Sequence, residues 1–361
     1  MTDLLKLEET VIFALRKLYL QYGYTQFKMS KFEEYDLYMK NKEFLVSDGV
    51  VTFTNTDGTL MALKPDVTLS IVKNFRDDQI PVHKVCYNEH VYRIVGTERS
   101  YREIMQSGLE CIGDVGAYEL CEVIMLALRS LQAISSAYVL DLSHLDLLDN
   151  LFGRLELTSE QIAQVMQCFA EKNEDELRHL VHPCKAEVLL RLMEIDEPIL
   201  SALEKLQDLA DNDSLKQLNQ LAAFLQAMGL ADRVHLDFSI VNDLNYYNGI
   251  VFSGYVDGIP TSILSGGQYD RLMEKMGKHA KAVGFAVYLD ELQALDRKPR
   301  SFDVDYVLVY DHDQTPDVLI HAAETLGDCR TLVVPAIPNN LRYRKLVKWK
   351  DGRLIELETH G

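Results

Sequence analysis

The hydrophobic pattern of the chain changes twice, and these changes constrain its fold more than any other feature. Up to about residue 143, strand-like alternation is mixed with single helical segments. Residues 144–230 then have a helical period almost throughout, and strand patterns return over 231–298. Strand-rich segments on both sides of a long helical stretch predict a discontinuous core, 1–143 with 231–298, interrupted by a helical insertion at 144–230.

Individual elements of the predicted core follow from periodicity. Apolar residues at helical spacing predict a helix within 1–21, and a strand pair turned at Asp57-Gly58 is predicted over 50–63. Further strands are expected at 82–94, 104–112, 233–241 and 248–258, and further helices at 64–75, 117–133 and 283–294. The prediction is an α+β fold in which a mixed, largely antiparallel sheet is flanked by helices.

The end of the chain has a pattern of its own. Residues 299–361 read as strand, helix, strand and a hairpin at Asp351-Gly352, which predicts a short α/β tail domain. Within it, residues 342–350 interleave basic and aromatic side chains. Such a segment could touch nucleic acid, but the exposed face of an amphipathic strand explains it better in a chain of net charge −18.

Composition and charge limit the classes of function. No apolar run is long enough to span a membrane, and the amphipathic start lacks the features of a secretory signal, so a cytoplasmic protein is expected. The six cysteines are scattered without a close pair, which argues against a zinc site and a disulfide framework. Because tRNA binding relies on basic faces, the net charge of −18 favours a protein or a small molecule as partner.

Four separated groups of residues carry a family resemblance. They are 62–68, then 91–93 with 101–110, then 244–249 with 265–270, and finally 283–286. In this order and spacing they resemble the class II aminoacyl-tRNA synthetase core, and specifically its histidine-specific branch, over roughly residues 5–295. The resemblance implies that the predicted sheet is the class II synthetase-like antiparallel sheet, with 144–230 as an insertion and 299–361 as a tail.

The chemistry of these segments suits free histidine. Acidic side chains can bind its ammonium group or a ring N–H, and tyrosine hydroxyls can bond a ring nitrogen. Gln106 and Glu110 stand four residues apart on a predicted strand, so both can point to one face. The resemblance implies that the histidine-binding residues are Asp66, Thr68, Arg93, Gln106, Glu110, Tyr246, Tyr247, Gly266 and Gly267.

Six of these residues also have an ordinary structural explanation. Alone, Tyr246-Tyr247 is more often packing and Gly266-Gly267 more often a turn. Asp66 beside Pro65 is typical of a helix start, and Glu110 alone would be a solvated strand residue. Found together at the family spacing, they favour the pocket.

The positions at which a synthetase holds its catalytic cations have changed. The resemblance places Asn242 and Glu291 where the enzymes have arginines, and Tyr288 where they have a glycine that gives room for adenine. An anion in place of a cation at a phosphate site reverses the sign of the interaction. Arg93 alone remains, so no catalytic residue is expected. Either Arg93 or a backbone N–H could hold the histidine carboxylate.

A retained pocket without these arginines, followed by a tail shorter than the family's anticodon-binding domain, resembles the regulatory subunits of ATP phosphoribosyltransferase. The resemblance implies an allosteric, non-catalytic subunit in histidine biosynthesis. It implies a homodimer within a hetero-oligomer that activates a short-form catalytic subunit and senses L-histidine, with no tRNA, metal or cofactor. A divergent histidyl-tRNA synthetase is one alternative. A repurposed paralogue is another, which Asp243 and Asn245 leave open because both depart from the family pattern.

Overall fold

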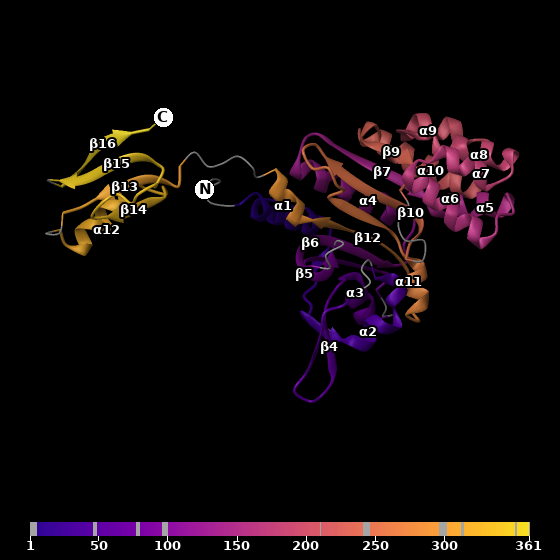
Figure 1. Ribbon diagram of the computed structural model, residues 1–361, viewed down its shortest axis with the longest axis horizontal. Helices are drawn as coiled ribbons and strands as arrows, with labels where there is room; N and C mark the ends of the chain where they lie inside the picture. Colours follow the sequence, from indigo (N-terminus) through magenta and orange to yellow (C-terminus); the bar gives the residue numbers. More distant parts are fainter. Residues whose placement is uncertain are drawn as a thin grey trace. The chain divides into compact units, whose positions relative to one another are not determined.

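The structure is a computed structural model that describes residues 6–45, 49–76, 80–95, 100–209, 211–240, 246–295, 302–311, 314–350 and 352–360. The chain divides into two compact units (Figure 1). The larger unit comprises Lys6–Leu295, and the described residues of the smaller unit lie within 302–360. Among the described residues, no helix is both long enough and apolar enough to cross a membrane.

The larger unit is built on a nine-stranded sheet with the order β1-β5-β6-β12-β11-β10-β7-β9-β8. Its strands are β1 (Thr25–Gln26), β5 (Val82–Val95), β6 (Ser100–Gly113), β7 (Tyr138–His144), β8 (Asp196–Pro198), β9 (Val234–Asp237), β10 (Asn248–Val256), β11 (Leu264–Gln268) and β12 (Lys281–Tyr288). The six strands from β5 to β7 pair antiparallel, whereas β1 pairs parallel with β5 and β9 pairs parallel with β7. The predicted mixed, largely antiparallel sheet is confirmed.

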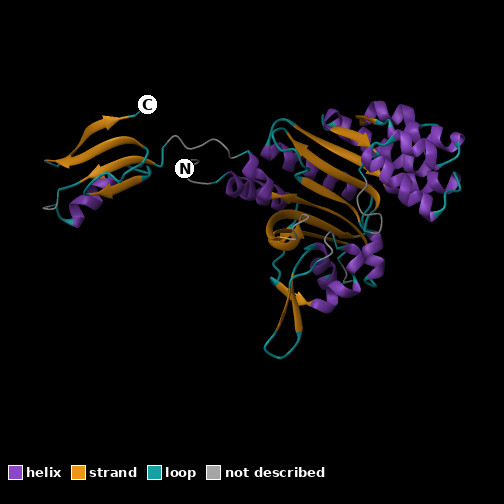
Figure 2. Ribbon diagram, in the orientation of Figure 1, coloured by secondary structure: helices purple, strands orange, loops and turns teal. Residues whose placement is uncertain are grey.

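Two long helices cover this sheet because each presents a broad apolar surface. Helix α1 (Leu7–Gln21) buries Val11, Leu15 and Tyr19, which share one face at spacings of four. Helix α4 (Ala117–Ile134) is buried on most of its surface, since it contacts α1, strands β7, β10 and β12, and helix α10 of the insertion. Figure 2 shows these helices against the strands.

Helices dominate the segment between β7 and β9. They are α5 (Leu145–Arg154), α6 (Ser159–Glu171), α7 (Glu174–Leu180), α8 (Pro183–Met193), α9 (Ile199–Leu206) and α10 (Asn212–Ala227), followed by the short η2 (Ala231–Arg233). The expectation of helix throughout is wrong at β8, whose three residues pair with β9. Three residues are too few to show a strand period in the sequence.

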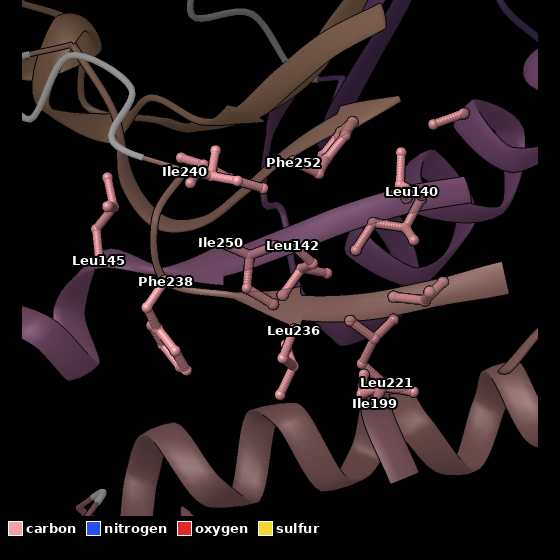
Figure 3. Packing of buried hydrophobic residues seen from close by; sticks show 14 of the residues in the cluster. Leu140, Leu142, Leu145, Ile199, Leu221, Leu236, Phe238, Ile240, Ile250 and Phe252 are labelled. Atoms are coloured by element: carbon pink, nitrogen blue, oxygen red, sulfur yellow. The ribbon is translucent and has the colours of Figure 1, made fainter. Parts of the chain in front are cut away.

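The proposed insertion is packed onto the sheet rather than set apart from it. Leu142 of β7, Leu236 of β9, Ile199 of α9 and Leu221 of α10 belong to one buried apolar cluster (Figure 3). Burial of this shared cluster stabilises the insertion and the sheet together.

A smaller three-stranded sheet precedes helix α3 (Thr68–Asn74) in the chain. It has the order β2-β4-β3, with β2 (Phe32–Glu34), β3 (Thr52–Thr54) and β4 (Leu60–Leu63). The predicted turn at Asp57-Gly58 is confirmed: Gly58 has a φ of +89°, which glycine adopts without strain. Helices α2 (Tyr35–Lys40) and η1 (Lys42–Phe44) lie between β2 and β3 in the chain, and α3 follows β4. The helix predicted at 64–75 begins only at Thr68, so Pro65 precedes it.

The helix predicted at 283–294 is wrong. Its first half belongs to strand β12, and only Leu289–Ala294 forms a 3₁₀-helix, η3. Strand β12 lies between β6 and β11 and is buried on both faces, so its run of apolar residues does not alternate. Such a continuous apolar run cannot be distinguished from a buried helix by periodicity.

The smaller unit has the predicted α/β elements. They are β13 (Val304–Val309), α12 (Pro316–Glu324), β14 (Thr331–Val334), β15 (Tyr343–Lys350) and β16 (Arg353–Thr359), with sheet order β14-β13-β15-β16. On the basic segment, Arg342 pairs with Asp303 at 2.8 Å, and Lys345 pairs with Glu356 at 2.7 Å. These ion pairs support the amphipathic-strand interpretation, because the two cations are already paired with acidic side chains of the same unit.

Candidate functional site

A cavity of about 390 Å³ lies in the larger unit, between the segment that leads into α3 and the strands β5, β6, β10, β11 and β12. Its volume is in the range of small-molecule sites. The lining residues are Leu45, Asp66, Val67, Thr68, Tyr87, Arg93, Gln106, Glu110, Tyr246, Tyr247, Ser253, Ser262, Ser265, Tyr269, Gly284, Phe285, Ala286 and Tyr288.

Seven of the nine predicted site residues line this cavity. They are Asp66, Thr68, Arg93, Gln106, Glu110, Tyr246 and Tyr247. Gly266 and Gly267 are not among the lining residues. They lie in β11, where a Cβ on Gly266 would be 2.5 Å from the Cβ of Phe285 and one on Gly267 would be 2.8 Å from the ring of Tyr247. The absence of a side chain at Gly267 therefore lets Tyr247 pack against the strand.

Asp66 and Arg93 form one polar end of the cavity. One carboxylate oxygen of Asp66 accepts the backbone N–H of Leu69 at 2.8 Å, so the helix-start explanation of this residue is also correct. The other lies 4.0 Å from the Arg93 guanidinium, whose Nε donates to the carbonyl of Pro65. Burial raises the pKa of Asp66, and the nearby Arg93 opposes that rise.

Glu110 occupies a different electrostatic environment. The Thr68 hydroxyl donates to its Oε1 at 2.7 Å, and the Tyr269 hydroxyl donates to its Oε2 at 2.8 Å. The pKa of Glu110 is raised to about 8, mainly by burial; the two hydroxyl donors oppose this rise, and the nearby Asp66 adds to it. Gln106 lines the same cavity, as the four-residue spacing on one strand predicts.

Tyrosine rings form an aromatic wall around Glu110. The ring of Tyr246 is 4.5 Å from that of Tyr247 and 6.1 Å from that of Tyr269. Burial holds the pKa of Tyr87, Tyr246, Tyr247 and Tyr269 well above the ordinary value for tyrosine. These phenols are therefore neutral hydrogen-bonding groups in the physiological range.

Sequence reasoning missed two of these tyrosines. Tyr87 precedes Arg93 by six residues on β5, so strand alternation places both on one face, and the period of two was a usable signal. Tyr87 fits because Gly108 opposite it has no side chain: a Cβ there would lie 2.5 Å from the Tyr87 hydroxyl. Tyr269 lay inside a recognised segment, but its contact with Glu110 depends on tertiary packing.

Of the residues expected to depart from the synthetase pattern, only some lie in the described part of the chain. Asn242, Asp243 and Asn245 lie outside the described residues. Glu291 accepts a hydrogen bond from the Thr261 hydroxyl at 3.1 Å, and the Tyr288 hydroxyl lies 2.7 Å from that of Ser265 at the cavity wall. Among the described residues that line the cavity, Arg93 is the one permanent cation.

Comparison with known proteins identifies the family. The family model described as histidyl-tRNA synthetase matches residues 3–292, which is most of the chain. The chain belongs to the histidyl-tRNA synthetase family. Among curated proteins, the ATP phosphoribosyltransferase regulatory subunit of Oceanobacillus iheyensis is 27% identical to this chain over 336 residues. The match covers 89% of this chain and 82% of that protein.

Solved structures related to this synthetase family have the same fold. A Bacillus halodurans protein described as an ATP phosphoribosyltransferase regulatory subunit/histidyl-tRNA synthetase matches with a TM-score of 0.77 and 19% identity, over 95% of this chain and 93% of that one. A chain of an ATP phosphoribosyl transferase complex from Thermotoga maritima matches with a TM-score of 0.63 and 19% identity, over 78% of this chain and 97% of that one. The class II synthetase-like fold is confirmed, as is the resemblance to these regulatory subunits.

Proposed function

We propose that this chain is a non-catalytic regulatory subunit of ATP phosphoribosyltransferase, which binds histidine and activates a short-form catalytic subunit. The cavity is the observation that carries the proposal, because it gathers acidic, arginine and tyrosine side chains from distant segments around a small-molecule volume. The names of the relatives support the link to this enzyme. The protein would act in the cytoplasm, in the first step of histidine biosynthesis.

The proposed ligand matches the charges of the cavity. Asp66 suits the α-ammonium group, and Gln106 and Thr68 can add neutral hydrogen bonds. Arg93 suits the carboxylate, because within the described part of the chain its terminal nitrogens make no hydrogen bond. The imidazole would lie toward Glu110 and the tyrosine wall. Histidine thus finds an opposite charge or a hydrogen-bond partner for each of its polar groups.

The charge of the cavity lining argues against adenylate formation from ATP. Adenylate formation needs positive charge held against phosphates. Arg93 is the one cation on the described lining, while Glu291 is an anion at a position where the resemblance implies an arginine in the enzymes. The Tyr288 hydroxyl contacts that of Ser265, and the resemblance implies a glycine at position 288 in the enzymes. A regulatory role needs neither phosphate binding nor catalysis.

The proposed assembly is a homodimer within a hetero-oligomer that contains the catalytic subunit. Histidine would regulate it by binding one state of the complex more tightly and shifting the population toward that state, with a coupling of about 1–3 kcal/mol. We propose no role for tRNA, because the chain carries a net charge of −18 and the basic residues Arg342 and Lys345 have acidic partners.

Calorimetric titration of the full chain with L-histidine and, separately, with ATP tests this function. The proposal predicts saturable histidine binding and no ATP binding. Binding of both, together with histidine-dependent exchange of pyrophosphate into ATP, would instead support a divergent histidyl-tRNA synthetase. Binding of neither would favour a repurposed paralogue of the fold.

A further inference from the structure

Strand β10 contains a bulge just after the tyrosine pair of the cavity wall. The pairing of β10 with β11 passes from Asn248 directly to Val251, so Gly249 and Ile250 lie between these pairs as extra residues. Gly249 has a left-handed φ of +57°, which glycine adopts without strain. The bulge begins two residues after Tyr247, so its geometry determines where the tyrosine pair lies.

The side chain of Gln268 completes the hydrogen bonding of this bulge. Ile250 is fully buried, so its N–H needs an acceptor within the protein. Oε1 of Gln268 accepts this N–H at 2.9 Å. The same amide lies directly against Gly249, where a Cβ would collide with Oε1. Gln268 thus takes the place of a strand partner for the bulge.

Two further side chains connect Gln268 with the helical insertion. Nε2 of Gln217, on α10, lies 3.5 Å from Oε1 of Gln268, and Oε1 of Gln217 lies 2.9 Å from Nε2 of His144. Nδ1 of His144 accepts the N–H of Leu147 in the first turn of α5, so the ring proton is on Nε2 and is donated to Gln217. His144 is also the β7 residue that pairs with Ile250. The contacts therefore enclose the bulge.

This bulge network consists of three side chains: His144, Gln217 and Gln268. None of the three belongs to the described lining of the cavity. Their link to the lining is short, because Gln268 stands between Gly267, against which Tyr247 packs, and the wall residue Tyr269. A shift of Gln268 would therefore reach the wall through the backbone of β11 as well as through the bulge.

Building on the proposed function, we infer that Gln217 of the insertion is a positioning residue for the ligand cavity: through Gln268 it fixes the bulge that sets the tyrosine wall, and it couples ligand binding to the insertion. Apolar burial attaches the insertion to the sheet, but such burial has no preferred direction. Hydrogen bonds fix both distance and angle. Because coupling is reciprocal, a ligand that orders the tyrosine wall also orders the insertion.

The start of β10 has a second anchor, which should preserve the fold when the bulge network is broken. Oδ1 of Asn248 accepts the N–H of Asp270 at 2.7 Å, and Oδ1 of Asp270 accepts the N–H of Ala282 on β12 at 2.8 Å. Neither contact involves the insertion. Removal of the Gln217 amide should therefore loosen the bulge without unfolding the strand.

Calorimetric titration of L-histidine into the full chain tests the role of Gln217. Gln217→Met removes both side-chain contacts at nearly constant volume, and it should weaken histidine binding about 2- to 30-fold. Gln220→Met makes the same change at an exposed position of the same helix. This control should stay within about twofold of the wild-type affinity.

Variants of Gln268 distinguish positioning from a general loss of packing. Gln268→Glu keeps an oxygen that accepts from Ile250 and Gln217, whereas Gln268→Met keeps none. The glutamate variant should bind histidine about 2- to 12-fold more tightly than the methionine variant. Gln217→Met combined with Gln268→Met should weaken binding by less than the product of the two single effects, because both substitutions break the same contact.

The outcomes separate this inference from the proposed function. Histidine binding of equal affinity to wild type and Gln217→Met overturns the inference and leaves the regulatory function standing. Equal losses in Gln217→Met and Gln220→Met, or independent effects of Gln217→Met and Gln268→Met, overturn it as well. No histidine binding to wild type overturns the proposed function and this inference with it.

Hydrogen exchange of wild type with and without L-histidine covers the case in which Gln217→Met does not fold. Saturating histidine should slow amide exchange in α10 more than in α6, an insertion helix that contributes no side chain to the bulge network. Equal slowing in both helices would report stabilisation of the whole unit instead. That result, or unchanged exchange in α10, would overturn the inference.

Discussion

At the residue scale, the cavity is organised around two buried carboxyl groups with different partners. Asp66 has Arg93 within 4.0 Å, whereas Glu110 has the hydroxyls of Thr68 and Tyr269. A charged partner favours the ionised form of a carboxyl group, and burial without one favours the protonated form. The two groups therefore suit two different parts of one amphoteric ligand.

Replacement of Arg93 by glutamine should weaken histidine binding about 10- to 100-fold, because a hydrogen bond to a charged group contributes about 1.5–3 kcal/mol. Calorimetry gives the affinity, and thermal unfolding checks that the fold is intact. Arg93→Lys, which retains the charge without the planar fork, should lose less. An unchanged affinity in Arg93→Gln would show that a backbone N–H holds the carboxylate instead.

The empty protein should lose stability as the pH rises toward 8 because of Glu110. The unfolded pKa of a glutamate is about 4.3 and the folded one is about 8, so the folded state binds more protons between these values. Relative to Glu110→Gln, wild type should lose at most about 1.4 kcal/mol of unfolding free energy per pH unit in this window. Urea unfolding at about pH 5.5 and pH 7.5 measures the difference. A constant difference between the two proteins would contradict the raised pKa.

The residue types of the site could be predicted from the sequence better than their contacts. Asp66, Arg93 and Glu110 were identified from motif spacing, and all three line the cavity. The hydrogen bond from Tyr269 to Glu110 joins residues 159 positions apart, and the pairing of Gly284 with Glu110 depends on strand order. No local pattern encodes such contacts.

At the scale of elements, the segment between β4 and α3 is tied to β5 by three polar contacts. The Lys64 ammonium contacts Glu89 at 2.5 Å, the Lys64 carbonyl accepts the Tyr92 N–H, and the Pro65 carbonyl accepts the Arg93 side chain. These contacts hold Asp66 and Arg93 at the cavity. The fully buried Lys64 thus acts as a positioning residue.

Lys64→Met should destabilise the protein by about 3–5 kcal/mol, because it leaves Glu89 without its buried partner. It should also weaken histidine binding through Asp66 and Arg93. Urea unfolding and calorimetry measure the two effects. The matched control is Lys73→Met, which breaks the more exposed pair of Lys73 with Glu33 and should cost about 1 kcal/mol or less. Equal effects of the two variants would exclude a positioning role for Lys64.

Element types were predictable where one face is exposed, and less so where both faces are buried. Helix α1 and the hairpin at Gly58 follow their sequence patterns. The sequence of strand β12 predicts a helix because the strand lies between β6 and β11 and is buried on both faces, which removes the strand alternation. Strand β8 exists only through its pairing with β9. Tertiary context, which a single sequence does not contain, decides such segments.

At the scale of the whole molecule, the ligand cavity belongs to one compact unit. Its lining residues all fall between Leu45 and Tyr288, and that unit extends to Leu295. The smaller unit has a separate apolar cluster that includes Leu308, Ala322 and Val347. The described lining of the cavity therefore includes no residue of the smaller unit, and the proposed histidine site is assigned to the larger unit.

A chain that ends at residue 295 should bind histidine with an affinity within about twofold of the full chain, which is a free-energy difference of less than 1 kcal/mol. Calorimetry on both proteins, with circular dichroism as a check of folding, makes the comparison. A folded truncated chain that has lost histidine binding would contradict the assignment of the site to the larger unit alone.

Reconstitution with a catalytic subunit directly tests the proposal that this chain regulates ATP phosphoribosyltransferase. The transferase activity of a purified short-form catalytic subunit is measured alone, with this chain, and with this chain plus L-histidine. The chain should raise the activity and histidine should lower it again, less effectively when the chain carries Arg93→Gln. If a catalytic subunit from the same organism neither binds the chain nor changes in activity, the proposed regulatory role is wrong.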